Sequence, residues 1–247
     1  VYIVTTILPS VVEDIGGLEY YAWNTTLFVA ASILGSALSS SLIDYLGLRA
    51  SYLLAILIFM LGSIAAAVSP LMPFMLGART IQGFGGGLLL GLSYSSVRMV
   101  FDERLWPRAM ALISSMWGVA TLSGPAIGGI FAQMGEWRLA FWSVLPCAAG
   151  LACLVWTQLR DARRPTASKS GSTLGKVLLL TASVLVMSAG SLSSSWLVNL
   201  AGVAVGAALV YVMALADRRS TSRLFPQGTY SVHTALGSLY AGIGLVS

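Results

Sequence analysis

The chain has 247 residues, of which 57% are hydrophobic and only 9% are charged, and its formal net charge is +5. A soluble globular domain carries about 25% charged residues, so this composition excludes one and indicates a membrane protein with several spans. The basic residues lie in short loops between apolar runs, so we expect them to set orientation in a lipid bilayer and not to bind nucleic acid.

Nine apolar segments follow one another, and each complete one is close to the roughly 20 residues that cross a bilayer. The complete spans are predicted at 23–43, 51–69, 72–97, 109–132, 139–156, 174–190 and 196–216, with partial spans at 1–12 and 234–247. Because the first and last segments are incomplete, we expect a fragment of a longer protein, truncated at both ends.

Basic residues are concentrated in alternate loops, which hold Arg49, then Arg98, Arg104 and Arg108, then Arg160, Arg163, Arg164, Lys169 and Lys176, then Arg218, Arg219 and Arg223. The opposite loops hold Glu13, Asp14, Glu19 and Glu136, with Arg138 as their only basic residue. This asymmetry predicts that the arginine-rich loops are cytoplasmic and that the 13–19 loop faces outward.

Polar stretches divide the chain. The longest, 160–173, is predicted to be a flexible cytoplasmic linker after a six-helix unit at 1–159. A two-helix hairpin is expected at 174–216, followed by a cytoplasmic loop at 217–229. The remaining residues, 230–247, contain the start of a further helical unit.

Asp44, Gly47 and Arg49 lie in a short turn between the second and third spans. Gly47 permits a tight reversal, and the two charged side chains can interact with the ends of neighbouring helices. The pattern is compatible with a gate between helix ends. It is also that of a solvated turn, which the charge pattern alone favours.

Arg79 is the ionisable residue that lies deepest in a complete span, about six residues into the fourth. A buried arginine is costly in a bilayer, so a functional role outweighs the alternative that the side chain snorkels to the interface. Gln82 is one helical turn further on and can share its hydrogen bonds. Three glycines spaced by four residues then form one small face, which predicts close helix packing: Gly83, Gly87 and Gly91.

The fifth span contains the stretch Gly124-Pro125-Ala126-Ile127-Gly128-Gly129. Proline removes a backbone hydrogen bond and bends a helix, and the glycines allow a second helix to approach, so the pattern is typical of a bundle that moves. Trp117 lies near the middle of this span and is a candidate for stacking on an aromatic substrate, with core packing as the simpler alternative. Asn24-Thr25-Thr26 is a glycosylation sequon at a span start, to which we give no weight.

Metal and cofactor chemistry is not indicated. His233 is the only histidine, and Cys147 and Cys153 share one predicted span. We therefore expect no cofactor, no metal and no histidine-based catalytic triad.

Together these residues resemble the major facilitator superfamily, specifically its fourteen-helix drug:proton antiporters. Gly118 with the Gly124–Gly129 stretch is similar to the antiporter motif of the fifth helix. The other matching positions are Ile3, Val4, Leu8 and Pro9; Leu42, Asp44, Gly47 and Arg49; Leu76, Arg79, Gln82, Gly83 and Gly85; and Trp137, Arg138, Phe141, Trp142 and Pro146. The gate motif departs from the family at Ser40, Tyr45 and Leu48, and the family's first-helix acidic residue would precede Val1.

The resemblance implies an all-α polytopic bundle, consisting of an N-terminal six-helix half and two linker helices. It implies a proton-coupled exporter of small amphipathic compounds in the inner or plasma membrane, which we expect to be monomeric. Arg79 and Gln82 would serve proton coupling, Asp44, Gly47 and Arg49 the gate, and the fifth-helix motif the conformational change. A symporter or facilitator for a nutrient on the same fold is the alternative, ahead of a membrane-embedded enzyme or sensor.

Overall fold

The computed structural model describes residues 2–159, 178–179, 181–183, 185–186 and 196–219. The chain divides into two compact units, Val1–Ser168 and Lys169–Ser247. All regular elements in the described residues are helical. The first unit contains α1 (Tyr2–Ile15), η1 (Leu18–Tyr20), α2 (Tyr21–Leu46), α3 (Leu48–Ala67), α4 (Met72–Val100), η2 (Glu103–Leu105), α5 (Trp106–Gln133), α6 (Trp137–Trp142) and α7 (Val144–Gln158). The second unit contains α9 (Trp196–Arg219).

Five stretches of the described chain are long and apolar enough to cross a membrane. They are Leu18–Leu46, Leu48–Ala67, Glu103–Gln133, Trp137–Gln158 and Trp196–Leu215. These stretches confirm a multi-pass, all-α membrane protein, and they match the predicted second, third, fifth, sixth and eighth spans.

The predicted fourth span forms α4, a helix of 29 residues. It is not among the five apolar stretches, because Arg79, Gln82 and its glycines lower its hydropathy. The predicted linker at 160–173 and the predicted span at 234–247 lie outside the described residues, as do most of the span at 174–190 and of the loop at 217–229.

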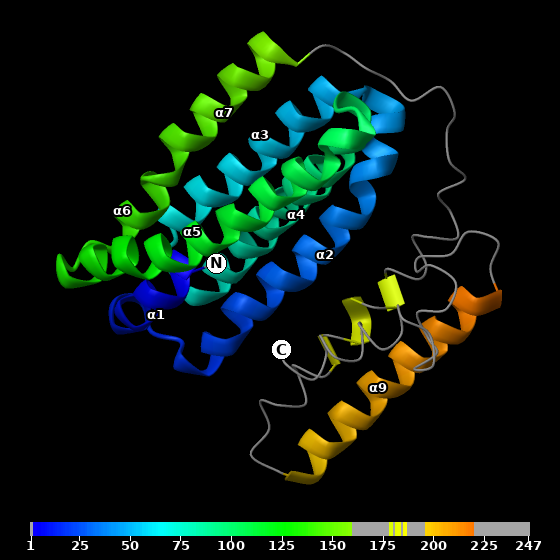
Figure 1. Ribbon diagram of the computed structural model, residues 1–247. Helices are drawn as coiled ribbons and strands as arrows, with labels where there is room; N and C mark the ends of the chain where they lie inside the picture. Colours follow the sequence, from blue (N-terminus) through cyan, green and yellow to red (C-terminus); the bar gives the residue numbers. More distant parts are fainter. Residues whose placement is uncertain (1, 160–177, 180, 184, 187–195, 220–247) are drawn as a thin grey trace. The chain divides into compact units, whose positions relative to one another are not determined.

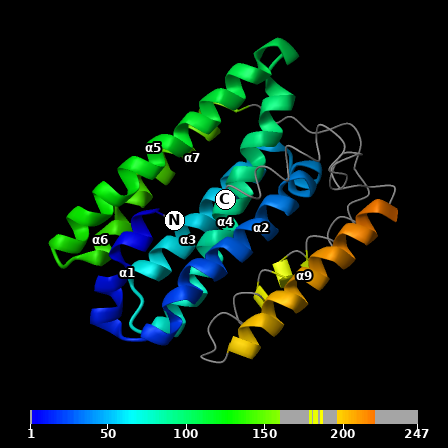
Figure 2. The ribbon, with the colours of Figure 1, turned by 60° about the horizontal axis from the view of Figure 1, so that its bottom comes forward.

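Within the first unit, α4 packs against both α2 and α3, and α1 packs against α5 and α6. Both views show α2, α3 and α4 running side by side (Figures 1 and 2). Two apolar cores follow from this packing. The first core joins α1, the end of α3, the start of α4 and α6. The second core joins α2, α3, the middle of α4 and α7.

The predicted sixth span at 139–156 is interrupted in the structure. The helix α6 ends at Trp142 and α7 begins at Val144, with Ser143 between them. Pro146 has no N–H to donate to the carbonyl of Trp142, so a continuous helix would lose that bond and clash at that point. The hydroxyl of Ser143, at the interruption, donates to the carbonyl of Ala140 at 2.9 Å.

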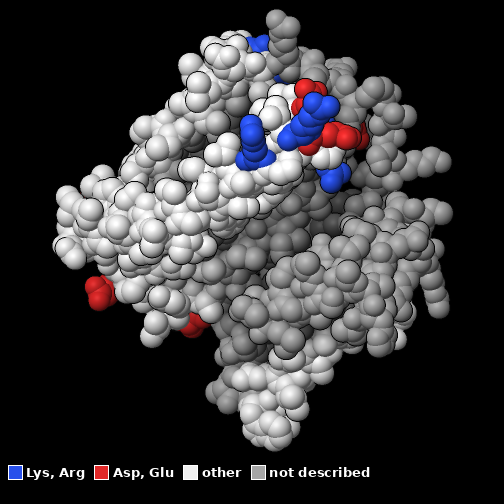
Figure 3. Space-filling view, in the orientation of Figure 1, with Lys and Arg blue, Asp and Glu red and all other residues white. Residues whose placement is uncertain are grey.

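Charged side chains gather at the ends of the first unit. Figure 3 shows basic and acidic residues together over the turn between α4 and α5, and acidic residues at the opposite end, with a broad uncharged surface between them. An uncharged band between two charged ends is the distribution that a bilayer requires.

Asp14, at the end of α1, joins this helix to α6. Its Oδ2 accepts hydrogen bonds from Arg138 Nη1 at 2.7 Å and from Trp137 Nε1 at 3.1 Å. Arg138 also donates to the carbonyl of Ser69 at 3.4 Å. The Arg138 hydrogen bond, followed by that of Trp137, lowers the pKa of Asp14 below its ordinary value of 3.8.

Because the folded pKa of Asp14 is lowered, its charge stabilises the fold above its ordinary pKa, and this contribution is lost as the pH falls through the folded value. We expect Asp14→Asn to lower the melting temperature at pH 7 by about 1–3 °C, since the pair is exposed. The wild-type and variant melting temperatures should converge as the pH falls through the lowered pKa of Asp14, because the protonated carboxyl, like the amide of asparagine, carries no charge. Thermal melts from pH 2 to 8 measure this, with the neighbouring exposed Glu13→Gln as control; an equal difference at every pH would contradict it.

Candidate functional site

Arg79 is the central residue of the site. It lies seven residues after the start of α4 at Met72, hence roughly 10 Å along the helix. Its side chain is only 1% exposed. No carboxylate of the described residues lies within ion-pair distance of it, since the one ion pair among them joins Arg138 and Asp14. The charge is therefore held by neutral groups.

Neutral side chains from α2 and α4 contact the guanidinium. Arg79 Nε donates to Asn24 Oδ1 on α2 at 3.1 Å, and Arg79 Nη1 donates to Gln82 Oε1 one turn along α4. Gln82 Nε2 donates in turn to Ser63 Oγ on α3 at 2.8 Å. The guanidinium carbon also lies 4.1 Å from the centre of the Phe28 ring, a cation–π contact. A polar chain therefore links α2, α4 and α3 inside an apolar bundle.

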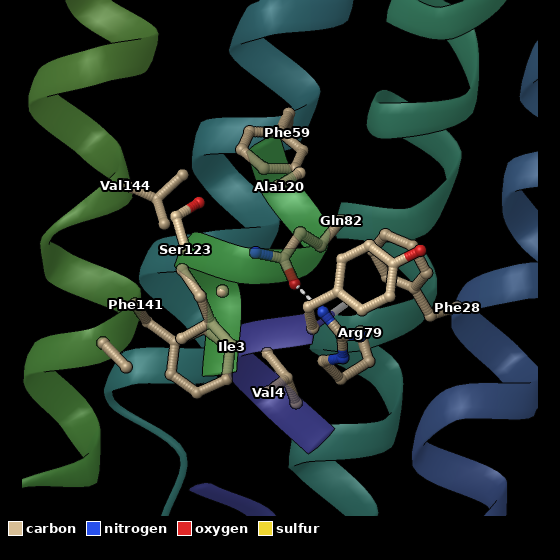
Figure 4. Close-up of a pocket in the computed structure, with 13 residues that line it drawn as sticks. Ile3, Val4, Phe28, Phe59, Arg79, Gln82, Ala120, Ser123, Phe141 and Val144 are labelled. Atoms are coloured by element: carbon tan, nitrogen blue, oxygen red, sulfur yellow. Dashed lines mark hydrogen bonds between the residues drawn. The ribbon is translucent and has the colours of Figure 1, made fainter. Parts of the chain in front are cut away.

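A cavity of about 250 Å³ opens beside this chain. Small-molecule pockets begin at roughly 300 Å³, so the cavity has room for a small ligand or for part of a larger one. Figure 4 shows Arg79 and Gln82 within it, with Phe28 on one side and Phe141 on the other. The lining is mostly apolar and comes from the six helices α1 to α6 and from the start of α7: Tyr2, Ile3, Val4, Phe28, Phe59, Arg79, Gln82, Ala120, Ser123, Gly124, Ala140, Phe141 and Val144.

Glycines bring α4 close enough to its neighbours to form these contacts. A Cβ atom on Gly83 would collide with the backbone of Phe28, and one on Gly87 with the backbone of Ser32. Gly91 faces α2 in the same way, and Gly85 meets the backbone of Phe59 on α3. The three glycines at intervals of four therefore all face α2, where only a hydrogen atom fits.

The turn between α2 and α3 consists of a single residue, Gly47, with φ 82° and ψ 167°. Its N–H donates to the carbonyl of Ile43 at 2.9 Å. Asp44 and Arg49 do not pair with each other. The buried atoms Asp44 Oδ1 and Arg49 Nε have no hydrogen-bond partner among the described residues, and the Arg49 guanidinium lies 4.1 Å from the centre of the Trp156 ring on α7.

We expect Gly47→Ala to lower the free energy of unfolding by about 1–3 kcal/mol, because residues with a Cβ avoid this backbone conformation. The matched control is Gly150→Ala in α7, where a Cβ would meet open space. Alanine has the higher helix propensity, so the control should be neutral or stabilising. Denaturation in detergent measures both variants, and equal stability of the two would contradict the strain at Gly47.

The glycine-proline stretch lies on α5, which continues through Pro125 to Gln133. Gly124 and Gly128 face α1: an added Cβ would lie 2.5 Å from Tyr2 Cβ and 2.8 Å from the Ile3 carbonyl oxygen, respectively. At Gly118 and Gly129 it would meet open space. Of these four glycines of α5, Gly124 and Gly128 therefore pack on α1, whereas Gly118 and Gly129 have no neighbour within 4 Å of an added Cβ.

Trp117 does not join the site in this structure. Its side chain is 47% exposed, and it is absent from the residues that line the cavity. The aromatic residues that line the cavity come from other helices: Tyr2, Phe28, Phe59 and Phe141.

Sequence reasoning missed Asn24 as part of the site. This residue is fully buried, and its side chain reaches Arg79 across 55 positions of sequence. The available signal was a polar amide at the start of an apolar span, since such a residue needs a partner inside the membrane. No group of three or more histidine, cysteine or acidic residues that could hold a metal ion is found in the described part of the chain.

The bundle and its buried cation define a multi-pass membrane protein with a polar site inside the bilayer region. Comparison with known proteins gives the family: the model of the Major Facilitator Superfamily matches residues 1–246. The chain belongs to this superfamily.

Several relatives have names that describe a function, and this chain aligns with only part of the length of each. A probable multidrug-efflux transporter of Mycobacterium tuberculosis is 37% identical over 236 residues, which are 93% of this chain and 50% of that protein. An MFS-type efflux pump of a Fusarium species is 31% identical over 202 residues, 78% of this chain and 36% of its own. The multidrug efflux pump SdrM of Staphylococcus aureus is 28% identical over 161 residues, which are 63% of this chain and 35% of that protein. The chain spans about half the length, or less, of these curated relatives.

Proposed function

We propose that the full-length protein is a secondary-active exporter of drugs or other small amphipathic compounds, driven by inward proton flow. The observation that carries the proposal is a buried arginine without a carboxylate partner among the described residues, facing an apolar cavity. An intramembrane charge marks a substrate or ion pathway by default. The names of the relatives, which describe multidrug efflux, support the same direction of transport.

In this proposal Arg79 and Gln82 belong to the proton pathway. Only neutral groups among the described residues contact this charge. Its electrostatic interaction with an acidic group or a proton carrier that comes near would be strong, because the local dielectric constant is low. The aromatic rings around the cavity would bind the apolar part of the substrate. Transport would proceed by alternating access, with the site exposed to each side of the membrane in turn.

The proposed gate is the turn that contains Asp44, Gly47 and Arg49. Two buried polar atoms there lack partners among the described residues, so a second group must satisfy them in at least one state of the transporter. We propose that this end of the bundle is cytoplasmic, as the arginine-rich loops indicate. Gly118, Gly124, Pro125, Gly128 and Gly129 would shape α5, whose uncovered glycines leave room for another helix.

A flux assay tests the function. The full-length protein is reconstituted into liposomes, a pH gradient is imposed, and movement of the fluorescent dye ethidium is followed. An exporter moves dye against the proton flow, whereas a symporter moves it in the same direction. Dye movement with the protons, or movement that ignores the gradient, would overturn proton-driven export.

A further inference from the structure

Two residues of α2 hold the guanidinium of Arg79 from different sides. Asn24 accepts a hydrogen bond at the edge, on Nε, and Phe28 covers the face with its ring. The two residues are four positions apart, so they lie on the same face of the helix, one turn from each other. Gly83 allows this contact, because a side chain there would collide with the Phe28 backbone.

The pair constrains which donors of Arg79 remain available. A guanidinium has five N–H donors in a rigid plane. Asn24 takes the one on Nε and Gln82 takes one on Nη1, while the ring of Phe28 prevents the plane from turning. Arg79 also lines the cavity, so its remaining donors are those that can meet a ligand or a proton-carrying group there.

Asn24 can accept a hydrogen bond from the Arg79 guanidinium without neutralising its positive charge. Its side chain is fully buried, and its Nδ2 has no hydrogen-bond partner in the described part of the chain. An aspartate at this position would form an ion pair with Arg79. A neutral amide supplies the acceptor and leaves the positive charge available, and it does not take up a proton in the physiological range.

We propose that Asn24 and Phe28 are positioning residues for Arg79, which aim its guanidinium into the cavity. The effect on transport rests on the proposed function, but the contacts of Asn24 and Phe28 with Arg79 are a property of the bundle itself. Positioning of the guanidinium requires a hydrogen-bond acceptor at Asn24 and an aromatic ring at Phe28. Side chains of the same volume without these groups would not position it.

The first test measures the reactivity of the Arg79 guanidinium and does not depend on transport. The full-length protein is labelled with phenylglyoxal, which modifies free guanidinium groups, and modification of Arg79 is quantified by mass spectrometry. Asn24→Leu keeps the volume and removes the acceptor, so we expect labelling of Arg79 to become about tenfold faster. Asn24→Asp keeps the acceptor and should leave labelling slow. The neighbouring Thr25→Val, at a residue that is not a partner of Arg79, is the control.

The second test compares gradient-driven transport of ethidium with substrate exchange in the absence of a gradient. Asn24→Leu should reduce the gradient-driven rate about tenfold and change the exchange rate little, since the cavity is kept. Phe28→Leu should give a several-fold loss that Phe28→Tyr restores, because tyrosine keeps the ring face.

The outcomes separate the two proposals. Wild-type labelling and wild-type coupled transport in Asn24→Leu would overturn the positioning role while leaving the exporter intact. Absence of coupled flux in the wild-type protein would overturn the proposed function, and the labelling comparison would still decide the positioning role.

Discussion

Replacing Arg79 with alanine is expected to abolish transport driven by a pH gradient and to leave membrane insertion intact. The variant removes the one charged group that lines the cavity in the described residues. Membrane insertion should be intact, because alanine raises the hydropathy of this span whereas arginine at its interior opposes insertion. We therefore expect a loss of at least about 100-fold in the coupled rate, with normal amounts of protein in the membrane.

Two matched variants make this result specific. Arg79→Lys keeps the charge, but a compact ammonium group cannot stack on Phe28 and donate to Asn24 and Gln82 in the same planar arrangement, so we expect it to restore little. Arg98→Ala removes an exposed arginine from the last turn of the same helix and should transport normally. Proteoliposome flux, normalised to the reconstituted protein, measures all three. Undiminished gradient-driven flux in Arg79→Ala would exclude Arg79 from the proton pathway.

Helix positions were predictable from the sequence because the bilayer imposes a simple rule on composition. Runs of apolar residues near 20 in length predicted most helices of the first unit, and glycine marked the reversal at Gly47. The fourth helix shows the limit of the rule. Arg79 and several glycines reduce its hydropathy, although these are the residues through which it packs against α2 and α3 and forms the site.

The partners of Arg79 were harder to predict. Gln82 is one turn away on the same helix, so helical geometry alone brings the two together. Asn24 and Phe28 are on another helix, and their contact with Arg79 depends on the rotation and register of α2 against α4. Nothing local encodes that register except the glycine face, which identifies a packing surface without naming the residues opposite it. For the same reason the sequence indicates Trp117 as an aromatic candidate, whereas the rings that line the cavity in the structure include Phe28 and Phe141.

Gly87→Ala is expected to disrupt both the bundle and the site, although it adds only one methyl group. The new Cβ would overlap the backbone of Ser32, so α2 and α4 would have to separate. Overpacking of this kind costs about 1–3 kcal/mol, and here the obstacle is backbone, which cannot move to another rotamer. Separation of the helices would also lengthen the 3.1 Å bond between Arg79 Nε and Asn24 Oδ1. Stability and coupled transport should therefore fall together.

Gly77→Ala is the matched control, because Gly77 lies in the same helix and an added Cβ there meets open space. Alanine favours a helix over glycine by up to about 1 kcal/mol, so this variant should be neutral or more stable, with normal flux. Thermal melts in detergent and proteoliposome flux measure both variants. If Gly87→Ala were as stable and active as Gly77→Ala, α2 and α4 could not be in the close contact that positions Asn24 and Phe28 against Arg79.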